Sequence, residues 1–306
     1  MKHSIKVTIL LVLFYFLAQI IGLGFVYSDI RVATVITETG QNITVVSHPE
    51  TALGPRPDLY NLDAIFMVLI GVLIGTGLVL IIVKFNKVNI WRGFFFFAVF
   101  MTITLSVGVF FNWYVAAVIG FLLAFLKMWK RNVVIHNLTE LLAYSGIAVL
   151  FAPLFEPLWM VILLLVISVY DMFAVWQSKH MVKMAEFQIE SDVFAGLSIP
   201  YRTVRSKSNH PKHKNQNSKQ VTGQNTAILG GGDVAFPLIF AAVVMESFIK
   251  SGIFGPVALI KALPIPIITA IVLLVLLVFG KKGRYYPAMP FLTAGCLIGY
   301  FISVFL

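Results

Sequence analysis

Long apolar runs separated by short polar segments dominate the chain. A helix that crosses a bilayer core about 30 Å thick needs about 20 apolar residues, and nine runs meet or approach that length. These runs cover approximately residues 5–28, 62–83, 91–111, 113–129, 133–153, 157–178, 226–248, 252–280 and 286–306. The pattern therefore predicts an all-α polytopic membrane protein with nine transmembrane helices.

Loops that are rich in Lys and Arg alternate along the chain with loops that have few. This predicts an orientation, because Lys and Arg accumulate on the cytoplasmic side. With a cytoplasmic N-terminus, only Arg31, Arg56, Lys250 and Lys261 face outside. The inside set holds Lys2, Lys6, Lys84, Lys87, Arg92, Lys127, Lys130, Arg131, the basic residues of 179–225, Lys281, Lys282 and Arg284. We expect a cytoplasmic N-terminus and a C-terminus outside.

Two loops are long enough to have a character of their own. The outer loop, about 29–61, is rich in Thr and Val and could form a short hairpin across residues 38–42. Residues 205–225 are rich in Lys, Asn, Gln, Ser and His, a composition that cannot bury a core and predicts disorder. The expected organisation is a six-helix part, 1–178, a largely disordered cytoplasmic loop, 179–225, and a three-helix part, 226–306.

Composition supports a lipid environment. Hydrophobic residues make up 59% of the chain and charged residues 12%, against roughly 25% charged in soluble domains. The net charge of +10 could suggest nucleic acid, but no basic stripe with interleaved aromatics occurs, so we expect no nucleic-acid partner. The single cysteine, Cys296, excludes an intrachain disulfide. We expect an integral, multi-pass membrane protein, in the plasma membrane if the source is microbial.

A charge near the middle of a membrane costs several kcal/mol and needs a reason, and Asp171 and Asp233 are the two best candidates for such an acid among the predicted spans. Asp171 lies about seven residues before the cytoplasmic end of the sixth span, and Asp233 about seven after the start of the seventh. At a rise of 1.5 Å per residue, both carboxyl groups come out about 10 Å from the same face. Because consecutive spans are antiparallel, the two side chains can meet.

Paired carboxyl groups in a low-dielectric site cannot both ionise, so such a pair shares one proton. That state suits peptide hydrolysis: the ionised partner takes a proton from water, and the protonated partner donates to the carbonyl oxygen or the leaving nitrogen. Neither a metal nor a cofactor is needed, and we expect none.

Glycines and prolines flank these acids or the last span. Gly230, Gly231 and Gly232 precede Asp233 and weaken a helix, which suits local unwinding or, equally, a close helix contact. Pro287-Ala288-Met289-Pro290 frees backbone groups that a substrate could use, although a plain helix start also explains it.

Other polar residues have simpler interpretations. His136 and Glu140 lie four apart on one helix face, which predicts an interfacial pair rather than a metal or proton site. Glu246 falls at an outer helix end, where solvation alone is expected. Tyr170 could orient Asp171 or pack a substrate, or simply bond to a backbone carbonyl.

Three short motifs carry a family resemblance. Ser168-Val169-Tyr170-Asp171-Met172 resembles the Tyr-Asp motif of presenilins, and Gly230-Gly231-Gly232-Asp233 matches the Gly-x-Gly-Asp motif of intramembrane aspartyl proteases. Pro287-Ala288-Met289-Pro290 resembles the Pro-Ala-Leu motif, with methionine in place of leucine. With the nine spans and the hydrophilic loop, the chain is similar over essentially its whole length to the presenilin and signal peptide peptidase family. A microbial, archaeal homologue is expected.

The resemblance implies that Asp171 and Asp233 are catalytic. It also implies that Gly230, Gly232, Pro287, Ala288, Met289 and Pro290 shape the site. The expected partners are transmembrane-helix protein substrates and the lipid bilayer, and a homo-oligomer stays open.

The expected function is an intramembrane aspartyl endopeptidase that hydrolyses peptide bonds within transmembrane segments. The alternative is a proton-coupled transporter or cation channel that uses the same paired carboxyl groups. A third interpretation is a scaffold in which the acids only fix helix packing.

Overall fold

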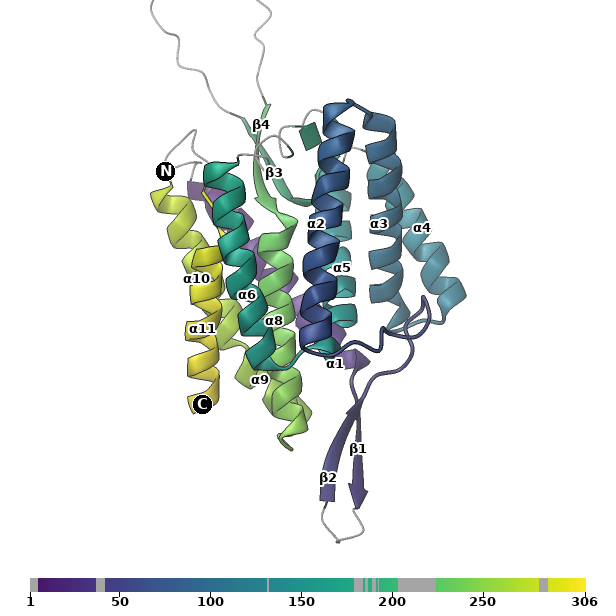
Figure 1. The fold of residues 1–306 in the computed structure, drawn as a ribbon, viewed down its shortest axis with the longest axis vertical. Helices are drawn as coiled ribbons and strands as arrows, with labels where there is room; N and C mark the ends of the chain where they lie inside the picture. The colour runs from purple at the N-terminus through teal and green to yellow at the C-terminus, as the bar shows by residue number, and fades with distance from the viewer. Residues whose placement is uncertain are drawn as a thin grey trace, which may run out of the picture.

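The computed structural model describes residues 5–36, 42–130, 132–178, 184, 187–188, 191, 193–202, 224–280 and 286–306. Within these ranges the helices run side by side as one bundle, with a two-stranded antiparallel sheet at each end (Figure 1). Strands β1 and β2 extend from one end, and β3 and β4 lie at the other.

The first six long helices are α1 (Ile5–Asp29), α2 (Leu62–Lys84), α3 (Val88–Gly108), α4 (Trp113–Trp129), α5 (Val133–Phe151) and α6 (Pro157–Met172). A 3-10 turn, Ala152–Leu154, follows α5, and a π-helical turn, Phe173–Gln177, extends α6. The later helices are α8 (Gly231–Lys250), α9 (Gly255–Ala262), α10 (Pro264–Phe279) and α11 (Met289–Phe305). Seven of the described helical segments are long and apolar enough to cross a membrane, and α4 and α11 are shorter apolar helices. The polytopic helical fold is confirmed, whereas the count of nine spans stays a prediction.

The expected hairpin in the outer loop is confirmed. Strand β1 (Arg31–Ile36) pairs antiparallel with β2 (Asn42–Ser47), from Arg31 opposite Ser47 to Ile36 opposite Asn42. The predicted turn lies mostly outside the described residues.

The expected start of the seventh span at residue 226 is wrong. Residues Gln224–Gly230 form β4, which pairs antiparallel with β3 (Gly196–Arg202), and the helix begins only at Gly231. Ala227 and Leu229 are buried while Thr226 is exposed, the alternation of a strand. A short apolar run cannot be assigned to strand or helix by periodicity alone. Strand β3 also lies within the loop expected to be largely disordered, whereas residues 203–223 lie outside the described part.

Proline moves two further helix boundaries. The eighth segment divides at Leu263 into α9 and α10, and the last helix starts at Met289 rather than at residue 286. Proline lacks the N–H that continues a helix but fits its first turn. Pro264 and Pro290 both occupy such first-turn positions.

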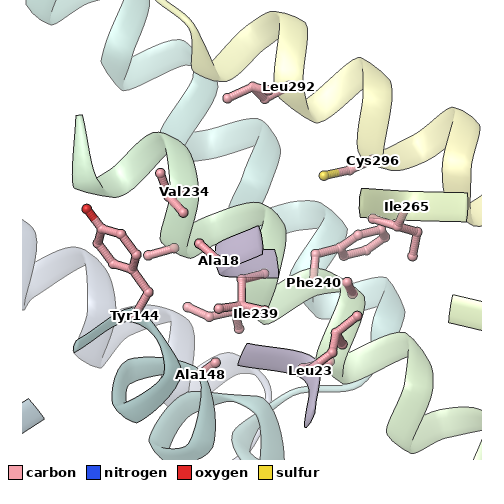
Figure 2. Close-up of a cluster of buried hydrophobic side chains, with 14 of the residues drawn as sticks. Ala18, Leu23, Tyr144, Ala148, Val234, Ile239, Phe240, Ile265, Leu292 and Cys296 are labelled. Carbon is pink, nitrogen blue, oxygen red and sulfur yellow. The ribbon is translucent and has the colours of Figure 1, made fainter. Parts of the chain in front are cut away.

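Helix α8 lies at the centre of the bundle. In its apolar window 72% of the residues are buried, against 17% for α2. Side chains of α1, α5, α10 and α11 surround its buried face, as the positions of Leu23, Ala148, Phe240, Ile265 and Leu292 show (Figure 2). This packing fixes the start of α8, and with it Asp233, inside the molecule.

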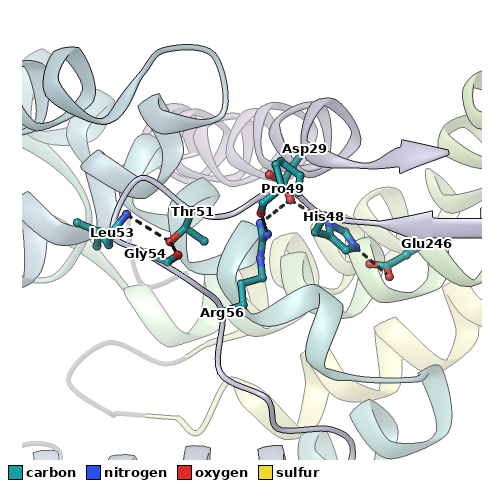
Figure 3. A network of polar contacts seen from close by, with 8 residues as sticks. All are labelled: Asp29, His48, Pro49, Thr51, Leu53, Gly54, Arg56 and Glu246. Carbon is teal, nitrogen blue, oxygen red and sulfur yellow. Dashed lines mark hydrogen bonds and ion pairs between the residues drawn. The ribbon is translucent and has the colours of Figure 1, made fainter. Parts of the chain in front are cut away.

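A network of charged side chains joins the outer loop to the bundle at the β1–β2 end (Figure 3). His48 lies between two carboxylates, with Nδ1 3.0 Å from Asp29 Oδ2 and Nε2 3.2 Å from Glu246 Oε1. Arg56 Nη2 donates to Asp29 Oδ2 at 2.6 Å, and Lys250 Nζ lies 2.9 Å from Glu246 Oε1. We call these five residues the outer ionic network.

Two consequences follow from the outer ionic network. Glu246 is only 2% exposed and ion-paired, so the expectation that solvent alone accounts for it is wrong. Burial by itself lowers the pKa of His48, but hydrogen bonds and charges from Asp29 and Glu246 outweigh burial and raise it above its usual value.

Candidate functional site

Asp171 lies in the last turn of α6, just before the backbone changes to a π-helical turn. Its side chain is buried, at 4% exposure. Asp171 Oδ2 accepts a hydrogen bond from the backbone N–H of Met289 at 3.1 Å, and the backbone of Ala288 also donates to this carboxyl group. Two N–H groups from the start of α11 therefore orient the Asp171 carboxyl group.

The Pro-Ala-Met-Pro segment supplies these donors because it forms a helix start. Ala288 is the N-cap of α11, and Met289 and Pro290 begin its first turn. The first N–H groups of a helix have no partner within the helix, and Pro287 and Pro290 have no N–H at all. Ala288 and Met289 are buried against α6, so their N–H groups bond to Asp171 within the protein.

A second hydrogen bond joins the same two helices close by. Ser168 Oγ lies 2.8 Å from Thr293 Oγ1, one turn away from Asp171 on α6 and from Met289 on α11. The contact between α6 and α11 is therefore held by polar groups on both sides.

Asp233 is the third residue of α8 and stands in its first turn. The N-terminal turn of a helix carries the positive end of the helix dipole and unpaired N–H groups, both of which favour a carboxylate. Gly230 caps this helix in an extended conformation, and a Cβ atom there would lie 3.2 Å from Asp233 Oδ2. Glycine therefore leaves the carboxyl group unobstructed.

The other two glycines differ in what surrounds them. A Cβ atom on Gly231 would lie 3.3 Å from the ring of Tyr144, so this position needs a small residue for close packing against α5. A Cβ atom on Gly232 would meet Phe236 at an ordinary 3.9 Å. Of the two glycines that the resemblance assigns to the site, Gly230 is the one where an added Cβ atom would crowd the Asp233 carboxyl group.

The structure brings together the two acids and part of the last motif. Helices α6, α8 and α11 pack against one another, and Asp171 and Asp233 are close enough for their charges to interact. The expected depth of Asp233, seven residues into a helix, is replaced by a strand followed by the first turn of α8. Tyr170 instead joins α6 to α2, through a 3.1 Å hydrogen bond to Thr76 Oγ1.

Gln19 is a polar residue of this region that the motifs did not reveal. It is fully buried in α1, and its Nε2 donates to the carbonyl oxygen of Val234, the residue after Asp233, at 2.8 Å. An amide inside a run as apolar as residues 5–28 is a signal that could have found it. Gln19 links α1 to the turn that carries Asp233.

The start of α5 holds strand β3. His136 Nε2 lies 2.8 Å from the Gly196 carbonyl oxygen, and Asn137 exchanges two hydrogen bonds with the Ser198 backbone, at 2.9 and 3.0 Å. Glu140 forms a buried ion pair with Lys127 of α4. His136 and Glu140 thus have separate structural partners. Within the described ranges, no three His, Cys, Asp or Glu side chains gather as metal ligands would.

An apolar cavity of about 680 Å³ opens beside the glycines. Residues of α2, α3, α5, α6 and α8 line it, among them Gly71, Ala98, Tyr144, Gly231 and Gly232. Its volume is within the range of roughly 300–1,000 Å³ typical of ligand pockets. The cavity therefore gives apolar groups access to the turn that carries Asp233.

Comparisons with known proteins agree with this arrangement. A family model described as "Signal-peptide peptidase, presenilin aspartyl protease" matches residues 54–306. Two solved structures of a presenilin family intramembrane aspartate protease are similar in fold. The one in space group C222 has a TM-score of 0.57 and 18% identity, covering 97% of this chain and 98% of that chain. The one in space group P2 has a TM-score of 0.54 and 19% identity, covering 98% and 97%. No curated protein matches the chain.

The family match extends over most of the chain and favours the protease over a transporter or a scaffold. The matched residues include the junction between β4 and α8, both acids and the start of α11. The chain belongs to the signal-peptide peptidase and presenilin aspartyl protease family, and it is a multi-pass integral membrane hydrolase.

Proposed function

We propose that Asp171 and Asp233 are the catalytic pair and that the protein hydrolyses peptide bonds within transmembrane segments of other proteins. The observation that carries the proposal is the juxtaposition of two acids from separate helices, one oriented by the N–H groups of Ala288 and Met289. Burying an acid inside a membrane costs free energy, which favours a functional role for both residues.

The reaction follows from a pair of carboxyl groups that shares one proton. The ionised member removes a proton from water as the water oxygen bonds to the scissile carbonyl carbon. The protonated member donates to the carbonyl oxygen, which forms a neutral diol. The carboxyl group that took the proton from water then gives it to the nitrogen, while the other, now ionised, carboxylate removes a proton from one diol hydroxyl. The C–N bond breaks, which yields an amine and a carboxylic acid and restores the singly protonated pair. The hydrogen bond from Met289 keeps Asp171 facing the reacting atoms.

We further propose that the substrate approaches through the 680 Å³ cavity beside Gly231 and Gly232. A helical substrate has its carbonyl groups already bonded, so it must unwind before water can attack. Strand β4 leads directly into Gly231, and the β3–β4 sheet has two strands in the described part of the chain. An unwound substrate could pair with the open edge of β4, because an exposed strand edge presents unpaired N–H and C=O groups.

The nine-span topology with a cytoplasmic N-terminus is part of the same proposal. Helices α4 and α11 have 17 residues each, the lower end of the length that spans a bilayer. Cysteines introduced singly into the α2–α3 and α4–α5 turns should react with a membrane-impermeant thiol reagent from the cytoplasmic side. Labelling of either turn from outside would contradict this topology.

The catalytic proposal is tested with purified protein in lipid nanodiscs and a model transmembrane substrate, with products identified by mass spectrometry. Asp171→Asn and Asp233→Asn should each abolish intramembrane fragments. Asp63→Asn is the matched control, because Asp63 is exposed at the start of α2. Thermal unfolding shows whether each variant is folded. A folded Asp171→Asn or Asp233→Asn protein that still cleaves at the parent rate would refute the assignment.

A further inference from the structure

We propose that a second cavity, at the β3–β4 end of the bundle, binds the headgroup and upper acyl chains of an anionic phospholipid. This cavity has a volume of about 1000 Å³ and lies between α3, α4, α5 and the β3–β4 sheet. It is separate from the 680 Å³ cavity beside Gly231 and Gly232, since the two share no lining residue. The lipid assignment rests on charge, on apolar lining and on position in the bundle.

The charge of the lining is positive. Arg92, Lys127 and Lys130 contribute to it, and no Asp or Glu is among the described residues that line the cavity. Lys127 is neutralised by its buried ion pair with Glu140. Arg92 donates to the Ser191 carbonyl oxygen at 3.2 Å, and a guanidinium has five N–H donors, so this bond to the described residues leaves further donors for a ligand. Arg92 and the exposed Lys130 therefore suit a phosphate group.

The rest of the lining is aromatic and apolar. Phe96, Phe121, Phe125 and Met128 line the side formed by α3 and α4. A small water-soluble anion gains nothing from contact with these apolar side chains. The acyl chains next to a phospholipid headgroup pack favourably against them. The combination of cations and aromatic rings thus selects an amphiphile whose polar end is anionic.

The location matches a membrane–water interface. Trp129 ends α4 and Lys130 follows it directly, and tryptophan and lysine are enriched where helices leave the bilayer. Basic pockets between transmembrane helices near the membrane surface are known to suit acidic lipid headgroups. The cavity opens where the headgroup of a lipid in the surrounding leaflet would lie.

The floor of the cavity connects it to the catalytic region. Ser198 and Pro200 of β3 and Thr226 and Ile228 of β4 line it, and β4 continues into Gly231 and α8. A bound lipid would contact the strands whose pairing precedes the turn of Asp233. Lipid occupancy is therefore expected to stabilise the β3–β4 sheet as well as the membrane contact.

The test uses the full chain, delipidated in detergent, and counts retained lipids by native mass spectrometry. The probes are dioleoylphosphatidylglycerol, dioleoylphosphatidylcholine and soluble glycerol phosphate. The double variant Arg92→Gln, Lys130→Gln removes the two cations proposed to bind the phosphate and leaves the ion-paired Lys127 in place. The matched control is Lys84→Gln, Lys87→Gln, which removes the same charge from exposed positions in the α2–α3 turn at the same end of the bundle.

The parent and the control should retain one phosphatidylglycerol in preference to phosphatidylcholine. The cavity variant should bind phosphatidylglycerol about thirtyfold more weakly, from the contribution of two cations. Equal loss in both double variants would overturn the proposal, because general surface charge would then explain retention. Binding of glycerol phosphate as tight as that of the lipid would also overturn it, in favour of a soluble anion. Lipid counting needs no substrate, so the result does not depend on the catalytic pair.

Discussion

Helix α11 approaches α10 so closely that one methyl group should disturb the site at its far end. Gly299 lies against the backbone of α10, where an added Cβ atom would be 2.6 Å from Ile265 Cα and 3.0 Å from Ile265 N. An ordinary contact begins at 3.4 Å, so Gly299→Ala requires a separation of about 0.8 Å, the difference between 3.4 and 2.6 Å. A backbone atom cannot rotate away, so the helix itself must move.

The displacement matters because α11 carries Met289. The bond from Met289 N to Asp171 Oδ2 is 3.1 Å long, and a shift of about 0.8 Å transmitted in full along α11 and directed along the bond would lengthen it to about 3.9 Å, the upper limit. That distance is beyond a hydrogen bond. Overpacking of this kind costs roughly 1–3 kcal/mol. We therefore expect the melting temperature to fall by several degrees and the rate of substrate cleavage to fall with it.

Gly295→Ala is the matched control, one turn away on the same helix. Its Cβ atom would meet Val272 Cγ2 at 3.2 Å, which a small movement of that side chain relieves, and Thr269 Cα at 3.4 Å, which is already an ordinary contact. Both variants are compared with the parent by thermal unfolding in detergent and by cleavage of a model substrate. Gly299→Ala behaving like Gly295→Ala in both assays would refute the reasoning.

Three further predictions concern interactions outside the catalytic pair. His48→Gln should lower the melting temperature most at acid pH: the pKa of His48 is raised on folding, so its contribution is complete below about pH 6.5 and is lost as pH rises through the folded value. A difference from the parent that grows toward alkaline pH would contradict this sign. Lys127→Met leaves Glu140 buried without its partner and should cost about 3–5 kcal/mol in denaturant unfolding, whereas Lys127→Met, Glu140→Leu should recover most of it; an equally unstable double variant would exclude this explanation. Ser168→Ala should cost about 1 kcal/mol, and adding Thr293→Val should cost little more because the same bond is already lost; fully additive effects would show that the bond contributes nothing.

Much of this protein's structure could be predicted from its sequence. Lipid permits few backbone structures, so apolar runs of about 20 residues translate directly into helices, as α1, α2 and α3 do. The cost of burying a charge likewise singled out Asp171 and Asp233 among the acids. The Thr- and Val-rich outer loop predicted its hairpin because β-branched residues flank a local turn.

What the patterns missed depends on contacts between segments distant in sequence. Residues 226–230 were expected to be helical, yet they pair with β3. A short apolar run fits a strand or a helix, and the contact with β3 decides between them. Glu246 was expected to be solvated, but His48 arrives from a hairpin about 200 residues earlier and the ion pairs bury it.

The sequence by itself determined the membrane fold and the two acids, because hydrophobic length and the cost of buried charge are properties of single segments. Only the tertiary structure decided which groups hold those acids in place. The N–H of Met289 reaches Asp171 across 118 positions, and the amide of Gln19 reaches the turn of Asp233 across 215. No local pattern encodes such bonds, since each exists only when separate helices pack at one depth and orientation.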